Sequence, residues 1–147
     1  MNFGKTNFLN LANMAFDKIS DDLELEREYK GIIKKIYVEK GMYSSIIILY
    51  EINDNGMLKH INDVYTFNGD YDYWYMEQLV KLLKQVNNLC KDDIDWTNID
   101  TICNSLEFLV GEEVRIKQSI NSQGKRKNEV KLTCDYKMEN LTIDEVL

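Results

Sequence analysis

One stretch in the first half of the chain constrains the fold more than any other. Two runs rich in β-branched and aromatic residues, about 29–38 and 43–52, are joined by a turn in which Gly41 can adopt a positive φ. A third run, 57–67, follows a turn that ends in Asn55-Gly56, a strong local signal for a β-hairpin. The first half of the chain is therefore predicted to form a three-stranded antiparallel meander.

The second half adds helices and then two further strands. Leucines and valines at helical spacing predict a helix over about 72–90, with Asp72 as its N-cap, and a shorter helix over 98–106. Alternation of apolar and polar residues predicts a strand over 108–120, and a short strand follows over 125–134. Five strands with a helical insertion between the third and the fourth predict an α+β fold, a five-stranded OB-like Greek-key β-barrel. A flat two-layer α+β sheet is the alternative.

The two ends of the chain differ from this barrel region, which covers 29–134. Residues 6–19 place apolar side chains at helical spacing behind Thr6, a suitable N-cap, and this predicts an amphipathic helix. The helix either packs on the core of its own domain or contacts a partner. Residues 135–147 form a polar, acidic tail. With 147 residues, the chain is expected to form a single domain over 1–147.

Composition narrows the class of protein. The net charge is −7 and the isoelectric point is near 4.8, so any contact with nucleic acid has to depend on local positive charge. Cys90, Cys103 and Cys134 lack C-x-x-C spacing, which favours buried thiols in a reducing cytosol over a disulfide framework or a zinc site. No apolar run reaches the roughly 20 residues that span a bilayer. The first residues also lack the layout of a signal peptide, so we expect a cytoplasmic protein.

The sequence contains no motif that predicts catalysis. His60 is the single histidine, and there is no Gly-rich phosphate loop, no H-E-x-x-H and no G-x-S-x-G. Asp92, Asp93 and Asp95 lie close together, but they lack the glycine and the terminal glutamate of a calcium-binding loop. We therefore expect neither an enzyme nor a bound cofactor or metal.

Basic residues alternate with aromatic residues on the predicted strands. Five basic and two acidic residues lie between Arg27 and Tyr50, and seven basic and four acidic residues lie between Leu109 and Lys137. A groove for single-stranded nucleic acid needs cations along the phosphates and aromatic faces that stack on bases. The alternative is that the rings fill the barrel and the lysines protect edge strands. The candidate nucleic-acid-binding residues are Lys34, Lys35, Tyr37, Lys40, Tyr43, Lys59, Tyr65, Phe67, Arg115, Lys117, Lys125 and Arg126.

A second aromatic group precedes and opens the helix predicted over 72–90. It consists of Tyr71, Tyr73, Trp74 and Tyr75. The first expectation is that these rings pack against the barrel, and the second is that they form a stacking surface at its edge.

Several of these segments together resemble a known family. The strand E-Y-K-G-I-I-K-K-I precedes the apolar strand S-S-I-I-I-L-Y-E-I, and the helix Q-L-V-K-L-L-K-Q-V precedes L-x-x-L-V-G-E-E-V-R-I over Leu106–Ile116. Over about residues 27–134, the chain resembles the OB-fold single-stranded DNA-binding proteins of bacteriophages of low-GC bacteria. The resemblance implies a non-catalytic viral protein that binds single-stranded DNA during replication or recombination in the cytoplasm of a bacterial host cell.

The resemblance also implies contacts with other proteins. Such proteins often end in an acidic tail with an apolar tip that docks replication or recombination partners, and M-E-N-L-T-I-D-E-V-L at the end of this chain is similar. The helix over 6–19 is a second candidate contact, including one between two copies of the chain. The candidate protein-binding residues are Phe8, Leu11, Phe16, Ile143, Val146 and Leu147.

Two other functions compete with binding of single-stranded DNA. A phage or mobile-element protein that binds and inhibits a host defence protein would suit the net charge of −7, because an acidic surface can mimic nucleic acid. An accessory subunit of a larger assembly would use the helix over 6–19 as its contact. Salt-dependent binding of labelled oligo-dT distinguishes these functions.

Overall fold

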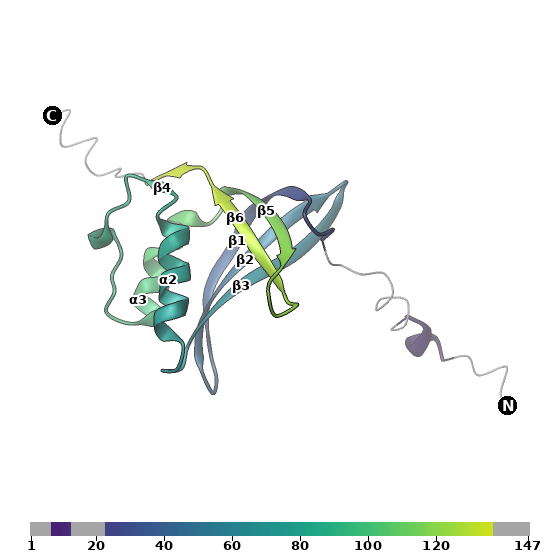
Figure 1. Cartoon of the computed structure of the whole chain (residues 1–147), viewed down its shortest axis with the longest axis horizontal. Helices are drawn as coiled ribbons and strands as arrows, with labels where there is room; N and C mark the ends of the chain where they lie inside the picture. Colours follow the sequence, from purple (N-terminus) through teal and green to yellow (C-terminus); the bar gives the residue numbers. More distant parts are fainter. Residues whose placement is uncertain (1–6, 13–22, 137–147) are drawn as a thin grey trace.

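A coiled antiparallel sheet and a layer of two helices make up the part of the chain that the structure describes. The computed structural model describes residues 7–12 and 23–136 (Figure 1). Five strands form the sheet in the order β3-β2-β1-β5-β6. Their bounds are β1 (Glu28–Lys40), β2 (Ser44–Asp54), β3 (Met57–Phe67), β5 (Glu113–Ile120) and β6 (Arg126–Leu132). The α+β class and the five antiparallel strands are thus confirmed, but β3 and β6 do not pair and the sheet is not closed into a barrel.

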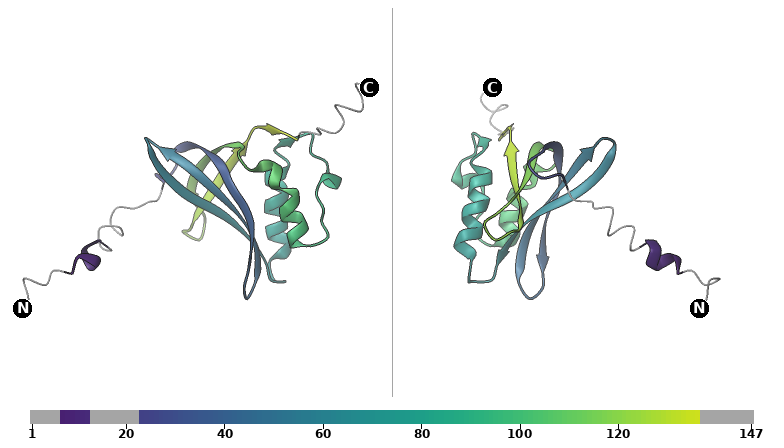
Figure 2. Two further views of the ribbon diagram at one scale, coloured as in Figure 1. Left: turned by 180° about the vertical axis from the view of Figure 1, so that it is seen from behind. Right: turned by 45° about the vertical axis from the view of Figure 1, so that its right-hand side comes forward.

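The helical layer lies between β3 and β5 in sequence. The helices are α2 (Asp72–Leu83) and α3 (Ile99–Ser105), and short 3-10 helices cover Lys91–Asp93 and Glu107–Leu109. β4 (Val86–Asn87) pairs in parallel with β7 (Cys134–Asp135) and fastens the end of the sheet to this layer. Figures 1 and 2 show both helices on one side of the coiled sheet.

β1 changes its pairing partner in its middle. Residues 28–32 pair with β5, and residues 31–40 pair with β2. Gly31 lies where the two pairings overlap, and a Cβ atom at this position would lie 2.6 Å from the backbone oxygen of Glu51. A bulge between Ile33 and Lys35 follows at once. Bulges and close backbone approaches at glycine bend strands, and together they account for the strong coiling of this sheet.

The core fills the space between the concave face of the sheet and the helices. β2 contributes Ile46, Ile48, Tyr50 and Ile52, which alternate onto one face as strand geometry requires. Leu79, Leu82 and Leu83 of α2 cover them, together with Leu106 and Leu109 after α3. Burial of these side chains, each worth about 1.5–3 kcal/mol, holds the helical layer on the sheet.

The first helix of the layer is shorter than the sequence predicts. It ends at Leu83 rather than near residue 90, because Val86 and the residue after it pair as a strand with β7. Asp72 is not the N-cap; that position is Tyr71. The Asp72 carboxylate instead accepts hydrogen bonds from the backbone amides of Asn68 and Gly69, each at 2.9 Å, and so fixes the turn that leads into α2.

Part of the predicted N-terminal helix lies within the described residues. Residues 8–12 are helical, and the side chain of Asn7 accepts a capping hydrogen bond from the amide of Asn10 at 3.0 Å, whereas Thr6, the predicted N-cap, lies outside the described residues. Phe8, Leu9 and Leu11 are between 52% and 77% exposed, so these side chains do not pack on the described core. The predicted contact residues outside the described residues are Phe16, Ile143, Val146 and Leu147.

The three cysteines are free thiols in different surroundings. Cys103 and Cys134 are buried as predicted, and desolvation raises the pKa of both thiols. Cys90 is exposed, which corrects the prediction for this residue. In the described ranges no helix is long and apolar enough to cross a membrane.

Candidate nucleic-acid interface

The predicted strand aromatics divide between the core and the surface. Tyr65 faces the core and is 6% exposed, so it offers no ring face to a base, which corrects the prediction for this residue. Phe67 is half-buried against the core, with its ring edge-on to Tyr75 at a centroid distance of 6.5 Å. Tyr37 is half-buried on the outer face of β1, where the Lys35 ammonium lies 4.7 Å from its ring centroid. Tyr43 is exposed in the β1–β2 turn.

Most of the predicted cations have carboxylate partners. Exposed ion pairs contribute only about 0–1 kcal/mol, so a phosphate group can replace the carboxylate at little cost, except at Lys59 and Asp54, whose side chains are only 12% and 16% exposed. Lys125 in the β5–β6 turn has no ion pair within the described part of the chain. The pairs are Lys34–Glu51 at 3.6 Å, Lys40–Asp100 at 2.8 Å, Lys59–Asp54 at 3.0 Å, Arg115–Glu28 at 3.0 Å, and Lys117 with Glu26 at 3.8 Å and Glu129 at 3.5 Å.

Arg126 has a structural role that the sequence did not predict. Its guanidinium donates hydrogen bonds to the Leu23 carbonyl at 2.7 Å and to Gln118 Oε1 at 2.9 Å. These bonds tie the segment before β1 to the β5–β6 hairpin.

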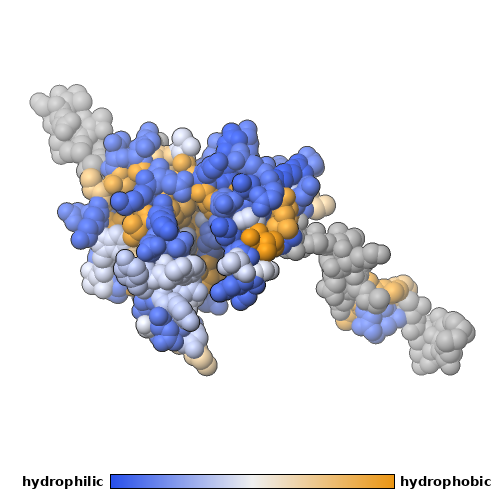
Figure 3. Space-filling model, viewed as in Figure 1, coloured by the Kyte–Doolittle hydropathy of each residue, from blue (hydrophilic) through white to orange (hydrophobic). Residues whose placement is uncertain are grey.

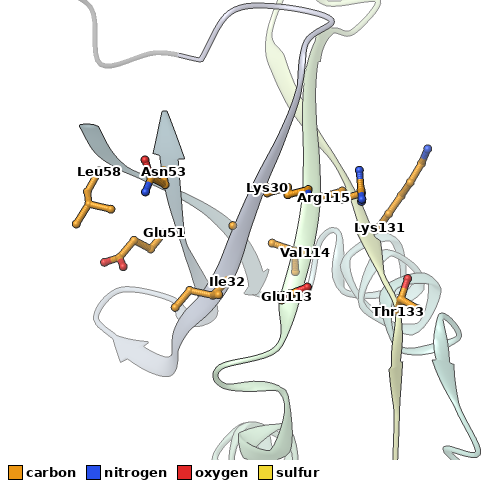
Figure 4. A pocket seen from close by; sticks show the side chains of 11 residues that line it. Lys30, Ile32, Glu51, Asn53, Leu58, Glu113, Val114, Arg115, Lys131 and Thr133 are labelled. Atoms are coloured by element: carbon orange, nitrogen blue, oxygen red, sulfur yellow. The ribbon is translucent and has the colours of Figure 1, made fainter. Parts of the chain in front are cut away.

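Strand pairing creates a basic row that the sequence did not reveal. Lys30 lies opposite Arg115, and Arg115 lies opposite Lys131, on adjacent strands of the outer face. The three side chains line a hollow of about 400 Å³ (Figure 4). Glu28 pairs with Arg115 at 3.0 Å and with Lys131 at 3.8 Å, and the hydrogen bond from Arg115 lowers the pKa of its carboxyl group. Glu51 and Glu113 also line the hollow, so its charge is mixed.

A second hollow, the seam cleft, lies where β3 and β6 fail to pair. The Asn128 side chain on β6 crosses the gap and donates to the Asn62 carbonyl at 3.0 Å and to Asp63 Oδ1 at 2.8 Å. The seam cleft has a volume of about 460 Å³. Aromatic, amide, lysine and aliphatic side chains line it, with one carboxyl group: Trp74, Tyr75, Gln78, Lys81, Leu82 and Gln85 from α2 and the turn after it, Asp63, Val64 and Tyr65 from β3, and Asn121, Lys127, Asn128 and Val130 from the β5–β6 hairpin.

Exposed rings lie at the start of α2, where Trp74 also lines the seam cleft. Tyr71, Tyr73 and Trp74 are between 55% and 82% exposed, which overturns the expectation that this group packs against the barrel. Tyr75 alone of the four packs against the core, and Trp74 contacts it edge-on at a centroid distance of 4.9 Å. Since Ser44 pairs with Phe67, the β1–β2 turn and the turn into α2 lie at the same end of the sheet.

The figures show this end at the bottom of the folded body. The β1–β2 turn, the start of α2 and the β5–β6 turn all point downwards in Figure 1. In the same view, Figure 3 shows a pale surface of intermediate hydropathy at the lower left, where α2 begins. The sheet and the first turn of α2 thus bring together flat rings, amide groups and lysines, which are the groups that stack on bases, hydrogen-bond to base edges and neutralise phosphates.

A chain of hydrogen bonds lies behind the seam cleft. Tyr50 Oη donates to Asp63 Oδ2 at 3.0 Å, and Gln118 Nε2 donates to Asn128 Oδ1 at 2.7 Å. With the bond from Asn128 to Asp63, these contacts connect β2, β3, β5 and β6 through side chains. Desolvation raises the pKa of Asp63 and that of Tyr50. The seam is therefore held by a largely buried polar network that includes one carboxyl group.

Replacing Asp63 with Asn should remove a pH dependence of stability. The folded-state pKa of Asp63 lies above its unfolded value, so the folded protein binds this proton more tightly than the unfolded chain does. The pKa of an aspartate in an unfolded chain is about 3.9. As pH rises from this value through the higher pKa of the folded state, ionisation of Asp63 therefore lowers the free energy of unfolding. In urea unfolding from about pH 4 to 8, the stability of Asp63→Asn relative to the unmodified protein should rise with pH and then level off. A difference that stays constant with pH would contradict this assignment.

Neither similarity to known proteins nor an arrangement of metal ligands in the described residues assigns a function to the site. No protein-family model matches the chain, and no curated protein matches it. Within residues 7–12 and 23–136, no group of three or more His, Cys, Asp and Glu side chains is arranged to hold a metal ion. His60 contacts Glu51 at 3.0 Å on the outer face, and this hydrogen bond lowers the pKa of the Glu51 carboxyl group.

Proposed function

We propose that the protein binds single-stranded nucleic acid without catalysis, at the seam cleft and at the exposed rings of the β1–β2 turn and the start of α2. The observation that carries this proposal is the exposure of Tyr43, Tyr71, Tyr73 and Trp74 at one end of the molecule. Large exposed aromatic groups mark interaction sites, and every base has a face on which such a ring can stack. Each stack contributes about 1–3 kcal/mol and tolerates any sequence.

We also propose that the sheet is an OB-type barrel left open between β3 and β6. The pairing of β1 with both β2 and β5, the helical insertion after β3 and the Asn128 bridge across the gap support this architecture. OB domains are partly open and bind oligonucleotides with the turns between strands one and two and between strands four and five. The equivalent turns here are the β1–β2 turn, with Tyr43, and the β5–β6 turn, with Lys125.

The distribution of charge supports a path for the phosphates along the β5–β6 hairpin. Residues 113–132 contain six basic and two acidic residues, whereas residues 68–112 contain nine acidic residues and three lysines. Lys81 and Lys127 line the seam cleft, and the row formed by Lys30, Arg115 and Lys131 lies further along the outer face. A polyanion would therefore follow β5 and β6 and avoid most of the helical layer.

The biological setting is part of the same proposal. The resemblance to phage single-stranded DNA-binding proteins supports DNA as the ligand, a role in replication or recombination, and the cytoplasm of a bacterial host cell as the location. The acidic tail would then dock a replication or recombination protein.

Trp74→Ala should weaken binding of fluorescently labelled oligo-dT by about 5- to 150-fold, the equivalent of one lost stack. Trp74→Phe keeps a ring at this position and should retain most of the affinity. Fluorescence anisotropy at several salt concentrations measures both effects.

Lys127→Ala should weaken binding and reduce the slope of log K against log salt by about 1, because it removes one phosphate contact. Lys84→Ala, an exposed lysine on the helical layer, is the matched control and should leave the slope unchanged.

Absence of oligo-dT binding at low salt would overturn the proposal. That result would favour a second function, inhibition of a host protein by an acidic surface. The specific observation behind this alternative is the excess of carboxylates in residues 68–112, which forms an acidic layer on the side of the molecule where α2 and α3 lie.

A further inference from the structure

An apolar groove runs along α2 and the segment that follows it. The α2 groove, as we name it, has a volume of about 730 Å³. Its charged lining residues are Lys84 and Lys91, which have no ion pairs among the described residues, and Cys90 lies beside them. Its apolar lining residues are Met76, Val80, Leu83, Val86, Leu89, Ile94 and Trp96.

The same chain carries an apolar segment without a partner in the described structure. Residues 7–12, which we name the arm, form a turn of helix that exposes Phe8, Leu9 and Leu11. Phe8 and Leu11 are three residues apart, the spacing at which an amphipathic helix presents anchors to a groove. Three large apolar side chains exposed within one turn mark a contact surface.

We propose that the arm of one copy of the chain packs into the α2 groove of a second copy. The groove is apolar and its charged lining residues are both lysines, whereas residues 13–22, which follow the arm in sequence, contain three aspartates and one lysine, so their charges are complementary. Arm and groove are different surfaces, so two copies can exchange arms, or each copy can pass its arm to the next.

This inference goes beyond binding of nucleic acid and does not depend on it. If the proposed function also holds, contacts from copy to copy would place neighbouring molecules side by side along one strand, which produces cooperative binding. The α2 groove and the seam cleft share none of their lining residues, so both can be occupied at once.

Sedimentation velocity of the full chain over a range of concentrations tests the inference. The unmodified protein should self-associate, and the arm variant Phe8→Asp/Leu11→Asp should associate at least about tenfold more weakly, because it loses two central apolar anchors. The groove variant Met76→Glu/Val80→Glu should behave in the same way, with circular dichroism to verify that α2 still folds. Val110→Asp, at an exposed apolar residue outside both surfaces, is the control and should associate normally.

Mixing the two variants provides the decisive observation. The arm variant keeps an intact groove and the groove variant keeps an intact arm, so the mixture should form a 1:1 complex although neither variant associates alone. Alkylation of Cys90 should slow as the concentration of the unmodified protein rises, and the arm variant should not show this protection.

Several results would overturn the inference. One is a monomer at every concentration, and another is association that persists in both variants. A third is protection of Cys90 that does not depend on concentration, because this would place the arm in the groove of its own chain. Loss of association on truncation after Tyr136, with no effect of the arm variant, would assign the groove to the tail. Oligo-dT binding is a separate measurement: its absence would end the proposed function and leave the result on self-association intact.

Discussion

Gly31→Val is expected to prevent stable folding of the protein. A Cβ atom at Gly31 would lie 2.6 Å from the backbone oxygen of Glu51 and 2.5 Å from Cδ1 of Ile52. The isoleucine side chain can rotate away, but the Glu51 carbonyl belongs to the paired strand β2 and cannot move without breaking the sheet. Even Gly31→Ala should lower the free energy of unfolding by about 3 kcal/mol, within the range for forced overpacking. Urea unfolding followed by circular dichroism measures this loss.

Gly41→Ala is the matched control. An added Cβ atom at Gly41 would meet no atom within 4 Å, so this substitution should change stability by no more than about 0.5 kcal/mol. Similar stabilities for Gly31→Ala and Gly41→Ala would mean that β1 and β2 do not approach as closely at Gly31 as the structure shows.

The effect at Gly31 bears on function because this residue sets the shape of the interface. β1 leaves β5 and joins β2 at Gly31, and the bulge after Ile33 then reverses which side chains face outward. Lys30 before the crossover and Lys35 after it consequently both lie on the outer face, although their sequence positions differ in parity. The coiling also brings β6 close to β3 without pairing them, and this leaves the seam cleft open.

Local signals were sufficient to predict the five strands of the main sheet, but not the start of β5. Residues 108–112 were expected to be strand, whereas Glu107–Leu109 form a 3-10 helix and β5 begins at Glu113. The turns at Gly41 and Asn55-Gly56 place β1, β2 and β3 within a few residues of their observed bounds. Long-range features were not predictable in this way. The row of Lys30, Arg115 and Lys131 depends on the register between strands far apart in sequence, and the open seam depends on side chains that reach across a gap.

The aromatic residues show one limit of prediction from the sequence and one sequence signal that the prediction did not use. Tyr65 shares the inward parity of β3 with Ile61, so its burial follows from the strand pattern once the face is known. At the start of α2, Tyr75 is four and seven residues from Leu79 and Leu82, and it therefore lies on their face of the helix. Tyr73 and Trp74 do not share this spacing. Helical periodicity alone would have separated the exposed rings from the buried one.

Asn128→Asp should strongly destabilise the protein at neutral pH. The Asn128 side chain lies 2.8 Å from Asp63 Oδ1, so the substitution would place two carboxyl groups in contact at a poorly solvated position. It would also remove the donor to the Asn62 carbonyl. A broken, partly buried polar pair of this kind costs about 3–5 kcal/mol. Urea unfolding at about pH 5 and pH 8 measures the effect and its pH dependence.

The sign of the pH dependence distinguishes charge repulsion from a simple loss of packing. Two carboxylates in contact cannot both ionise easily, so the folded state retains a proton to a higher pH than the unfolded chain does. The destabilisation by Asn128→Asp should therefore be smaller at about pH 5 than at pH 8. An equal loss at both values would mean that the new carboxyl group turns away from Asp63.

Exchanging Asp63 and Asn128 tests whether the two side chains are energetically coupled across the seam. The double variant Asp63→Asn/Asn128→Asp again contains one carboxyl and one amide group, and it should recover most of the stability that Asn128→Asp loses. A coupling energy near zero in this double-mutant cycle would contradict a contact between β3 and β6. A large coupling energy would show that a specific pair of side chains holds the seam. An interface built on an open sheet edge needs such a contact, because unpaired strands otherwise separate or recruit another chain.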